Sequence, residues 1–255
     1  MAHNNKNLGH HHTIKEEIFC HFPYAIFSVA FSIIMLSILS HMISDNQAFV
    51  QLFHDFHYLH ILFASTGVVL TFRKYSKSIL GALFTGVLVP AIFCTLSDSL
   101  LPYFGGVYLG LPVHFHWCFI AHLSSVLPFL AFGIINGFVL SNHATSQQLF
   151  FSTSSHFLHI FTSSMASILF LVAAGANDWH IYLGFIFMFL IIAVFVPCTL
   201  SDIVVPIIFA QKHDSYRGQQ SFGCCTRDLK NNEKSKLFVN DCRIKKNESN
   251  INQLG

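Results

Sequence analysis

The stretches HDFHYLHILFAS (residues 54–65) and SSHFLHIFTSS (residues 154–164) each place two histidines three positions apart in an otherwise apolar segment. The first pair is His57 and His60, and the second is His156 and His159, each 99 positions further along the chain. Residues i and i+3 of an α-helix share one face, so each pair would present two imidazoles to the same side. An apolar chain that contains this arrangement twice is a candidate for internal duplication.

Two further matches fall in the same order along the chain. The segment CTLSD occurs at residues 94–98 and again at 198–202, each time with a proline four residues after the aspartate. More weakly, His21 and the Ala-Phe pair that follows it match His122 and a second Ala-Phe pair. The offsets of 99, 104 and 101 residues are nearly constant, so the sequence predicts that its first half is duplicated in the second.

The composition indicates a membrane environment. Of the 255 residues 53% are hydrophobic and 10% are charged, and the mean hydropathy is +0.55, whereas about a quarter of the residues of an average soluble protein are charged. Six apolar stretches are long enough to cross about 30 Å of hydrocarbon as helices: residues 18–40, 52–72, 79–101, 117–140, 150–174 and 181–210. We therefore predict an all-α, polytopic membrane helix bundle with six transmembrane helices.

The distribution of Lys and Arg predicts how the chain is oriented. These residues occur in the N-terminal segment, at residues 73–77 and from Lys212 onward, while the connections at 42–51, 102–116 and 175–180 contain none. Because Lys and Arg are enriched in cytoplasmic loops, both termini are predicted to be cytoplasmic. The membrane is predicted to be the cell (inner) membrane. The basic residues gather at one membrane face and form no stripe of the kind that binds nucleic acid, so nucleic acid is excluded as a partner.

Each predicted repeat holds three spans, and an odd number of spans makes the second copy enter the membrane from the opposite side. The sequence thus predicts a 3+3 inverted-topology repeat, an arrangement found in many secondary transporters. The predicted domains are a cytoplasmic N-terminal tail (1–17), a first three-helix repeat (18–102), a second three-helix repeat (103–210) and a disordered, basic cytoplasmic tail (211–255). The sequence leaves a homo-oligomer open.

The inversion sorts the polar side chains into two predicted clusters. The cluster toward the outer face comprises His57, His60, Cys94, Asp98 and His122. The cluster toward the inner face comprises His21, His156, His159, Cys198 and Asp202. Two imidazoles with a carboxylate suit Zn²⁺, Fe²⁺ or Mn²⁺, and the cysteines, taken as optional ligands, would shift the preference toward zinc or copper.

The aspartates need a compensating partner if they are ionised inside a membrane. An unpaired carboxylate in hydrocarbon costs several kcal/mol, and the predicted spans around Asp98 and Asp202 contain no Lys or Arg. A protonated histidine, a bound cation or protonation of the aspartate itself would meet this need. Pro102 and Pro206 add to the polarity, because each leaves the carbonyl of the aspartate four residues earlier without its helical N–H partner.

The sequence leaves several functions open. The first is a transporter or channel for a divalent metal ion, with the bilayer and a small cation as its partners and the two clusters as successive binding sites. The second is a haem-binding redox protein, with His122 and His60, and His21 and His159, as axial pairs. The third is a membrane zinc hydrolase with Ser97 or Ser201 nearby, although no HExxH or GxSxG motif favours an enzyme.

A fourth interpretation is purely structural. Buried histidines are commonly hydrogen-bonded core residues, and the clusters would then only fix the packing of the helices. Gly133 and Gly137 form a GxxxG pattern, which predicts that their helix packs closely against another.

Overall fold

The computed structural model describes the backbone of residues 14–43, 45–115, 117–142, 147–176 and 178–213, and their side chains except at 14–21, 147–155 and 211–213. Residues 21–220 form one compact unit, and residues 1–20 with 221–255 form another. The features that follow belong to the first unit. The predicted tails at 1–17 and 211–255 lie mostly outside the described residues.

Every regular element in the described residues is helical, which confirms the all-α prediction. The α-helices are α1 (Ile14–Met42), α2 (Asn46–Tyr75), α3 (Ile79–Thr95), α4 (Leu101–Tyr108), α5 (Cys118–Ala121), α6 (Leu123–Asn142), α7 (Gln147–Ala173), α8 (Leu183–Thr199) and α9 (Val205–His213). Two π-helical turns, η1 (Leu96–Leu100) and η3 (Leu200–Val204), join α3 to α4 and α8 to α9, and a 3₁₀ turn, η2 (Trp179–Tyr182), precedes α8.

Five helical segments of the described chain are long and apolar enough to cross a membrane. They are Phe22–Met42, Ile79–Tyr108, Leu123–Asn142, His156–Ala173 and Trp179–Ala210. These correspond to five of the six predicted spans. The remaining one, predicted at 52–72, lies within α2, which has 30 residues but is less apolar because it carries several histidines and Asp55.

Burial separates central helices from peripheral ones. In the span His156–Ala173 of α7, 78% of the residues are buried, compared with 28% for Phe22–Met42 and 22% for Leu123–Asn142. Large apolar side chains are exposed on the peripheral helices, for example Phe27 (63%) on α1, Leu80 (80%) on α3 and Ile192 (64%) on α8. An exterior of this kind suits lipid rather than water. The helices therefore indicate a multi-pass membrane protein.

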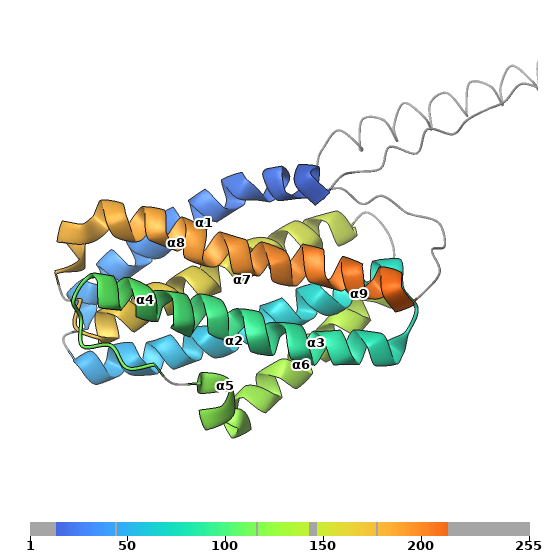
Figure 1. Ribbon diagram of the computed structural model, residues 1–255, viewed down its shortest axis with the longest axis horizontal. Helices are drawn as coiled ribbons and strands as arrows, with labels where there is room; N and C mark the ends of the chain where they lie inside the picture. The colour runs from blue at the N-terminus through green and yellow to red at the C-terminus, as the bar shows by residue number, and fades with distance from the viewer. Residues whose placement is uncertain (1–13, 44, 116, 143–146, 177, 214–255) are drawn as a thin grey trace, which may run out of the picture. The chain divides into compact units, whose positions relative to one another are not determined.

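Helices α2, α3–α4, α7 and α8–α9 lie roughly along one axis, and α2 and α7 pack against each other. In Figure 1, α2 and the α8–α9 segment run one way, whereas α3–α4 and α7 run the other way. The α2 helix also packs against α3 and α6. Local sequence fixes the ends: Asp45 Oδ1 accepts a hydrogen bond from the Gln47 N–H at 3.0 Å before α2, and Gly175, at φ +104°, follows α7.

Helix α6 approaches α2 through its glycines, as the GxxxG pattern predicts. A Cβ atom at Gly133 would lie 2.5 Å from the Leu62 carbonyl oxygen, and one at Gly137 would lie 2.7 Å from Val69 Cβ. The Thr66 hydroxyl also donates to the Gly133 carbonyl at 3.1 Å. The two backbones thus meet closely enough that the contact needs glycine.

Replacing Gly133 with alanine is expected to lower the free energy of unfolding by about 1–3 kcal/mol, because the new methyl group meets rigid backbone. Thermal unfolding of the purified protein in detergent micelles measures the change. Gly184→Ala is the matched control, since a Cβ at Gly184 meets nothing within 4 Å. Equal stability of the two variants would show that α6 does not depend on this contact.

The two π-turns stand at equivalent positions of the predicted repeats. The Leu101 N–H donates to the Leu96 carbonyl, and the Val205 N–H donates to the Leu200 carbonyl, so each bond spans five residues instead of four. Pro102 and Pro206 follow directly, and neither has an N–H to continue the α-helical pattern. Asp98 and Asp202 are the third residues of these turns. Such π-turns are frequent at functional sites.

Candidate metal centre

Helix α2 and turn η1 bring together the first histidine pair and its aspartate. His57 Nδ1 lies 2.8 Å from Asp98 Oδ2, and His60 Nδ1 lies 2.6 Å from the same oxygen. All three side chains are buried, with at most 1% exposed. Because an ionised carboxylate only accepts hydrogen bonds, both Nδ1 atoms act as donors, and the lone pair of each ring is on Nε2.

The second oxygen of Asp98 is also fully engaged. Oδ1 accepts hydrogen bonds from the hydroxyls of Ser97 and Ser163, each at 2.8 Å. Ser163 belongs to α7, so the carboxylate links the two central helices. Four hydrogen bonds explain how this carboxylate is accommodated in the interior without a Lys or Arg partner. The role of Ser163 was missed in the sequence, because nothing distinguishes it from the neighbouring serines and threonine of α7.

Helix α7 and turn η3 form a second cluster with the same pattern. His156 Nδ1 lies 3.2 Å from Asp202 Oδ2, and His159 Nδ1 contacts the same oxygen. All three residues are buried. The structure thus brings His57 and His60 together with Asp98, and His156 and His159 together with Asp202.

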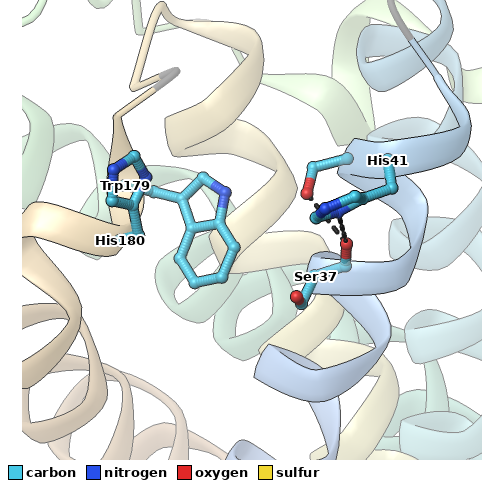
Figure 2. Close-up of a pocket in the computed structure, with 5 residues that line it drawn as sticks. Ser37, His41, Trp179 and His180 are labelled. Carbon is cyan, nitrogen blue, oxygen red and sulfur yellow. Dashed lines mark hydrogen bonds between the residues drawn. The ribbon is translucent and has the colours of Figure 1, made fainter.

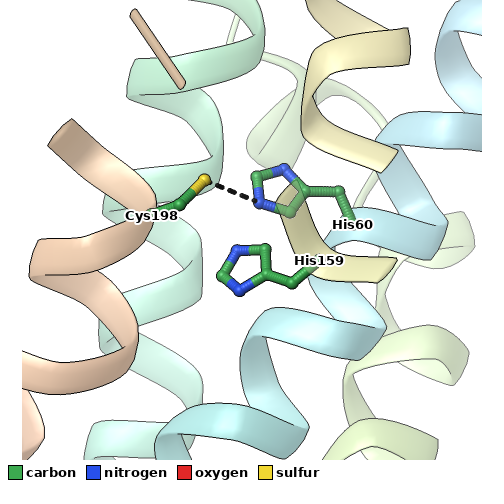
Figure 3. A group of neighbouring side chains, drawn as sticks. All are labelled: His60, His159 and Cys198. Atoms are coloured by element: carbon green, nitrogen blue, oxygen red, sulfur yellow. Dashed lines mark hydrogen bonds between the residues drawn. The ribbon is translucent and has the colours of Figure 1, made fainter. Parts of the chain in front are cut away.

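The two clusters meet at the centre of the bundle. The rings of His60 and His159 have centroids 4.6 Å apart. The thiols of Cys94 and Cys198 each place their sulfur 3.7 Å from His60 Nε2. Figure 3 shows His60 and His159 side by side, with the Cys198 thiol directed at the His60 ring.

This contact corrects the expectation of two separate clusters toward opposite faces. The apolar run predicts a second span that begins at Leu52, but α2 begins at Asn46, which is six residues or about 9 Å earlier. His60 therefore lies near the middle of α2 instead of near its beginning. His159 likewise lies near the middle of α7, so the inner members of the clusters share one centre.

The remaining predicted ligands behave differently. His122 lies in the turn between α5 and α6, and its ring packs edge-on against the ring of His54, with centroids 4.8 Å apart. It is therefore part of an aromatic pair with His54. The side chain of His21 lies outside the described residues.

The distance between His60 and Cys198 suits metal coordination. Bond lengths of about 2.0–2.1 Å to nitrogen and 2.3 Å to sulfur require an N···S separation of about 3.6 Å between neighbouring ligands, and Cys198 Sγ stands 3.7 Å from His60 Nε2. The ligand atoms of His60, His159 and Cys198 all lie within 4.8 Å of one another, as do those of His156, His159 and Asp202. These buried groups can hold a metal ion.

The geometry changes the roles that the sequence suggested. A carboxylate that accepts the Nδ1–H of a histidine orients the ring and leaves Nε2 for the metal. Asp98 therefore positions His57 and His60, and because both of its oxygens are already hydrogen-bonded it is poorly placed to be a ligand itself. The cysteines, predicted from the sequence as optional ligands, contact His60 Nε2, the nitrogen that faces the centre.

A pocket of about 330 Å³ lies at one end of the bundle, apart from this centre. It is lined by Ser37, Ser40 and His41 of α1 and by Trp179 and His180 of η2. In Figure 2 the Trp179 ring faces Ser37 and His41. His41 Nδ1 and the Ser40 hydroxyl both bond the Ser37 carbonyl, at 2.8 and 3.0 Å. These polar groups are satisfied within their own helix.

Comparison with known proteins identifies no relative. The chain matches no protein-family model, no curated protein and no solved structure. The function must therefore be inferred from the chain itself, a helical membrane protein with buried His, Cys and Asp groups that can hold a metal ion.

Proposed function

We propose that the protein is a transporter for a divalent metal ion, built from two three-helix repeats of inverted topology, and that it holds the ion where the repeats meet. The observation that carries the proposal is the shared centre, to which each repeat contributes one histidine and one cysteine. His60 and Cys94 come from the first repeat, and His159 and Cys198 from the second. In transporters with inverted repeats, the substrate site lies at the repeat interface near the bilayer midplane.

Contacts away from the centre support the duplication. Ser32 of α1 donates to the Phe161 carbonyl of α7 at 3.4 Å. At offsets of 101 and 99 residues the equivalent positions are Gly133 and Leu62, and Gly133 lies against the Leu62 carbonyl in the same way. Equivalent helices also run in opposite directions, α2 against α7 and α3 against α8, as an inverted repeat requires (Figure 1).

The proposal makes α2 the sixth span. At 30 residues, α2 is about 45 Å long, enough to cross a bilayer. Its histidines His57 and His60 face η1 and α7, so they meet protein and not lipid. An intramembrane helix that carries polar side chains is tolerated when those groups face the interior of the bundle. Six spans place both termini on the cytoplasmic side, together with Arg73, Lys74 and Lys77.

The burial of the centre corresponds to a closed state of the transporter. His60, His159, Cys94 and Cys198 are each at most 1% exposed. Rocking of one repeat against the other would open the centre to one face or the other. The π-turns at Asp98 and Asp202 provide breaks in α3–α4 and α8–α9 at the level of the site, like the discontinuous helices of such transporters.

The geometry is less favourable to haem. Axial imidazoles bind opposite sides of a porphyrin, whereas the rings of His60 and His159 are in contact at a centroid distance of 4.6 Å. His60 also has protein partners at both ring nitrogens, and His122 packs against His54.

A hydrolase is also less favoured by the environment of the serines. The Ser97 hydroxyl is bonded to Asp98, and Ser97 and Ser201 are at most 1% exposed. A membrane hydrolase needs room for both water and its substrate beside the metal.

Transport of Zn²⁺ into proteoliposomes tests the proposal. The wild-type protein is expected to give a saturable influx, and the double variant Cys94→Ala/Cys198→Ala is expected to reduce it by more than ~100-fold, since it removes ligands rather than their outer-shell partners. Cys118→Ala is the matched control, because Cys118 is also fully buried but contacts Ser99 at 3.8 Å instead of the histidines. It should transport within about two-fold of wild type.

Two results would contradict the proposal. If wild-type vesicles take up no more Zn²⁺ than vesicles without protein, the protein is not a transporter for this ion. If the folded double variant transports as well as Cys118→Ala, the ion does not pass through the centre.

A further inference from the structure

The two halves of the centre differ in how their aspartates are satisfied. Asp98 Oδ1 accepts hydrogen bonds from two hydroxyls, those of Ser97 and Ser163. Asp202 Oδ1 is buried and has no hydrogen-bond partner among the described residues. The sequence explains part of the difference, because the position equivalent to Ser163, 99 residues earlier, is Ala64. Alanine has no hydroxyl to donate.

The Asp202 carboxylate also packs directly against the backbone of Gly67. A Cβ atom at Gly67 would lie 3.1 Å from Asp202 Oδ2 and 3.2 Å from Oδ1. The equivalent position in the second half, 99 residues later, is Ala166, which carries a methyl group where Gly67 has none. Ala64 precedes Gly67 by three residues, so both lie on the same face of α2. The Asp202 carboxylate therefore faces a surface of small residues without a donor.

Two hydroxyl groups close to Asp202 in the sequence also lack hydrogen-bond partners among the described residues. The hydroxyls of Thr199 and Ser201 are buried and have no hydrogen-bond partner among the described residues. In the first half, by contrast, the equivalent Thr95 hydroxyl donates to the Ala91 carbonyl, and the Ser97 hydroxyl donates to Asp98 Oδ1. A buried acceptor without a donor costs about 1–3 kcal/mol. A cation bound at the carboxylate would remove this cost.

We propose that Asp202, with His156 and His159, forms a second binding site for the transported divalent cation, whereas Asp98 is a fixed positioning residue. This inference rests on the proposed function and assigns different roles to the two halves. The ligand atoms of the three residues lie within 4.8 Å of one another. Two imidazoles and a carboxylate form a harder ligand set than the thiolate centre and suit Zn²⁺, Co²⁺, Fe²⁺ or Mn²⁺.

His159 connects the two sites. It belongs both to the group with His60 and Cys198 and to the group with His156 and Asp202. A cation bound between His159 and Asp202 replaces the hydrogen bond from His159 Nδ1 to Asp202. The His159 ring must then shift, so it cannot at the same time keep its present position beside the cysteines. One ion therefore occupies the two sites in turn, with His159 as the ligand common to both. The corresponding site at Asp98 is closed, because a cation there would have to break the bonds from Ser97 and Ser163.

Cobalt binding in a thiolate-free background tests this second site. The full-length variant Cys94→Ala/Cys198→Ala, purified in detergent, is titrated with Co²⁺. One equivalent is expected to bind and to give d–d absorption bands without thiolate-to-cobalt charge transfer. Adding Ala64→Ser is expected to weaken this binding at least ~10-fold, because the new hydroxyl donates to Asp202 Oδ1 and reproduces the arrangement at Asp98.

A second variant and a control keep the test independent of folding defects. Gly67→Ala places a methyl group against the Asp202 carboxylate and adds no hydrogen-bond donor. It is expected to weaken Co²⁺ binding to a similar extent. Ala82→Ser introduces the same hydroxyl at another fully buried alanine, in a cluster with Phe72 and Ala210, and should bind Co²⁺ like the background. Gel filtration and circular dichroism establish that each variant is folded.

The inference is overturned if the thiolate-free protein binds no Co²⁺, or if folded Ala64→Ser and Gly67→Ala bind it as tightly as the background. These measurements are made at equilibrium and do not depend on flux. If the protein binds Co²⁺ at Asp202 in this way but moves no ion into proteoliposomes, the second site is supported and the proposed transport function is contradicted.

Discussion

Replacing Asp98 with alanine is expected to lower the free energy of unfolding by about 3–5 kcal/mol, because four buried hydrogen-bond donors lose their acceptor at ~1 kcal/mol or more each. The side chain accepts hydrogen bonds from His57, His60, Ser97 and Ser163. All four donors are buried, so each loses its acceptor without gaining water. Chemical unfolding in mixed micelles, followed by circular dichroism, measures the loss.

Alanine variants of two other aspartates provide the comparison for this result. Asp202→Ala is expected to cost less than Asp98→Ala, because His156 and His159 are its only donors among the described residues. Asp55→Ala should change stability by less than about 0.5 kcal/mol, since Asp55 is exposed and accepts a hydrogen bond from the exposed Gln51 amide of its own helix. If Asp98→Ala and Asp202→Ala were equally destabilising, the four-donor arrangement would not be what holds Asp98.

Replacing His60 with alanine is expected to reduce the affinity for Zn²⁺ by more than ~100-fold, beyond the effect of an outer-shell residue. His60 Nε2 is the nitrogen that both thiols approach, at 3.7 Å. Its loss leaves the two cysteines without the imidazole that stands beside them. Competition with a chromophoric zinc chelator, with the purified protein at neutral pH, measures the affinity.

Two other histidines separate a ligand from a positioning residue. His57 donates to the same Asp98 oxygen as His60, but it does not belong to the cluster of ligand atoms formed by His60, His159 and Cys198. His57→Ala is therefore expected to weaken Zn²⁺ binding by about 10-fold. His41 bonds a carbonyl of its own helix at the end of α1, and His41→Ala should bind Zn²⁺ like wild type. An equal loss in the His57 and His60 variants would indicate that both act only through packing.

Part of the candidate site followed from the sequence. The duplicated histidine pairs, the CTLSD segments and the following prolines predicted which histidines and aspartates belong together, and His57, His60 and Asp98 do lie in one cluster. This succeeded because the spacing of residues on one helix face is a local property. The same argument could not find Ser163, because a hydroxyl on another helix acquires its role only when the helices pack.

The depth of the site depended on where helices begin. A span drawn from the apolar run at Leu52 put the first histidine pair near a membrane face, whereas the cap at Asp45 starts α2 earlier and moves His60 toward the middle. Apolar runs mark where lipid is tolerated, but a helix continues as far as its backbone hydrogen bonds and caps allow.

The sequence by itself determined that this chain is a helical membrane protein and that polar residues recur in its two halves. Partition into lipid and helical periodicity depend on each segment alone, so they can be read without knowing its neighbours. Only the tertiary structure decided that His60 and His159 touch, that cysteines contact the centre, and that Asp98 is saturated while Asp202 is not. Those features arise from side chains on different helices, and their contacts are set by how whole helices pack against one another.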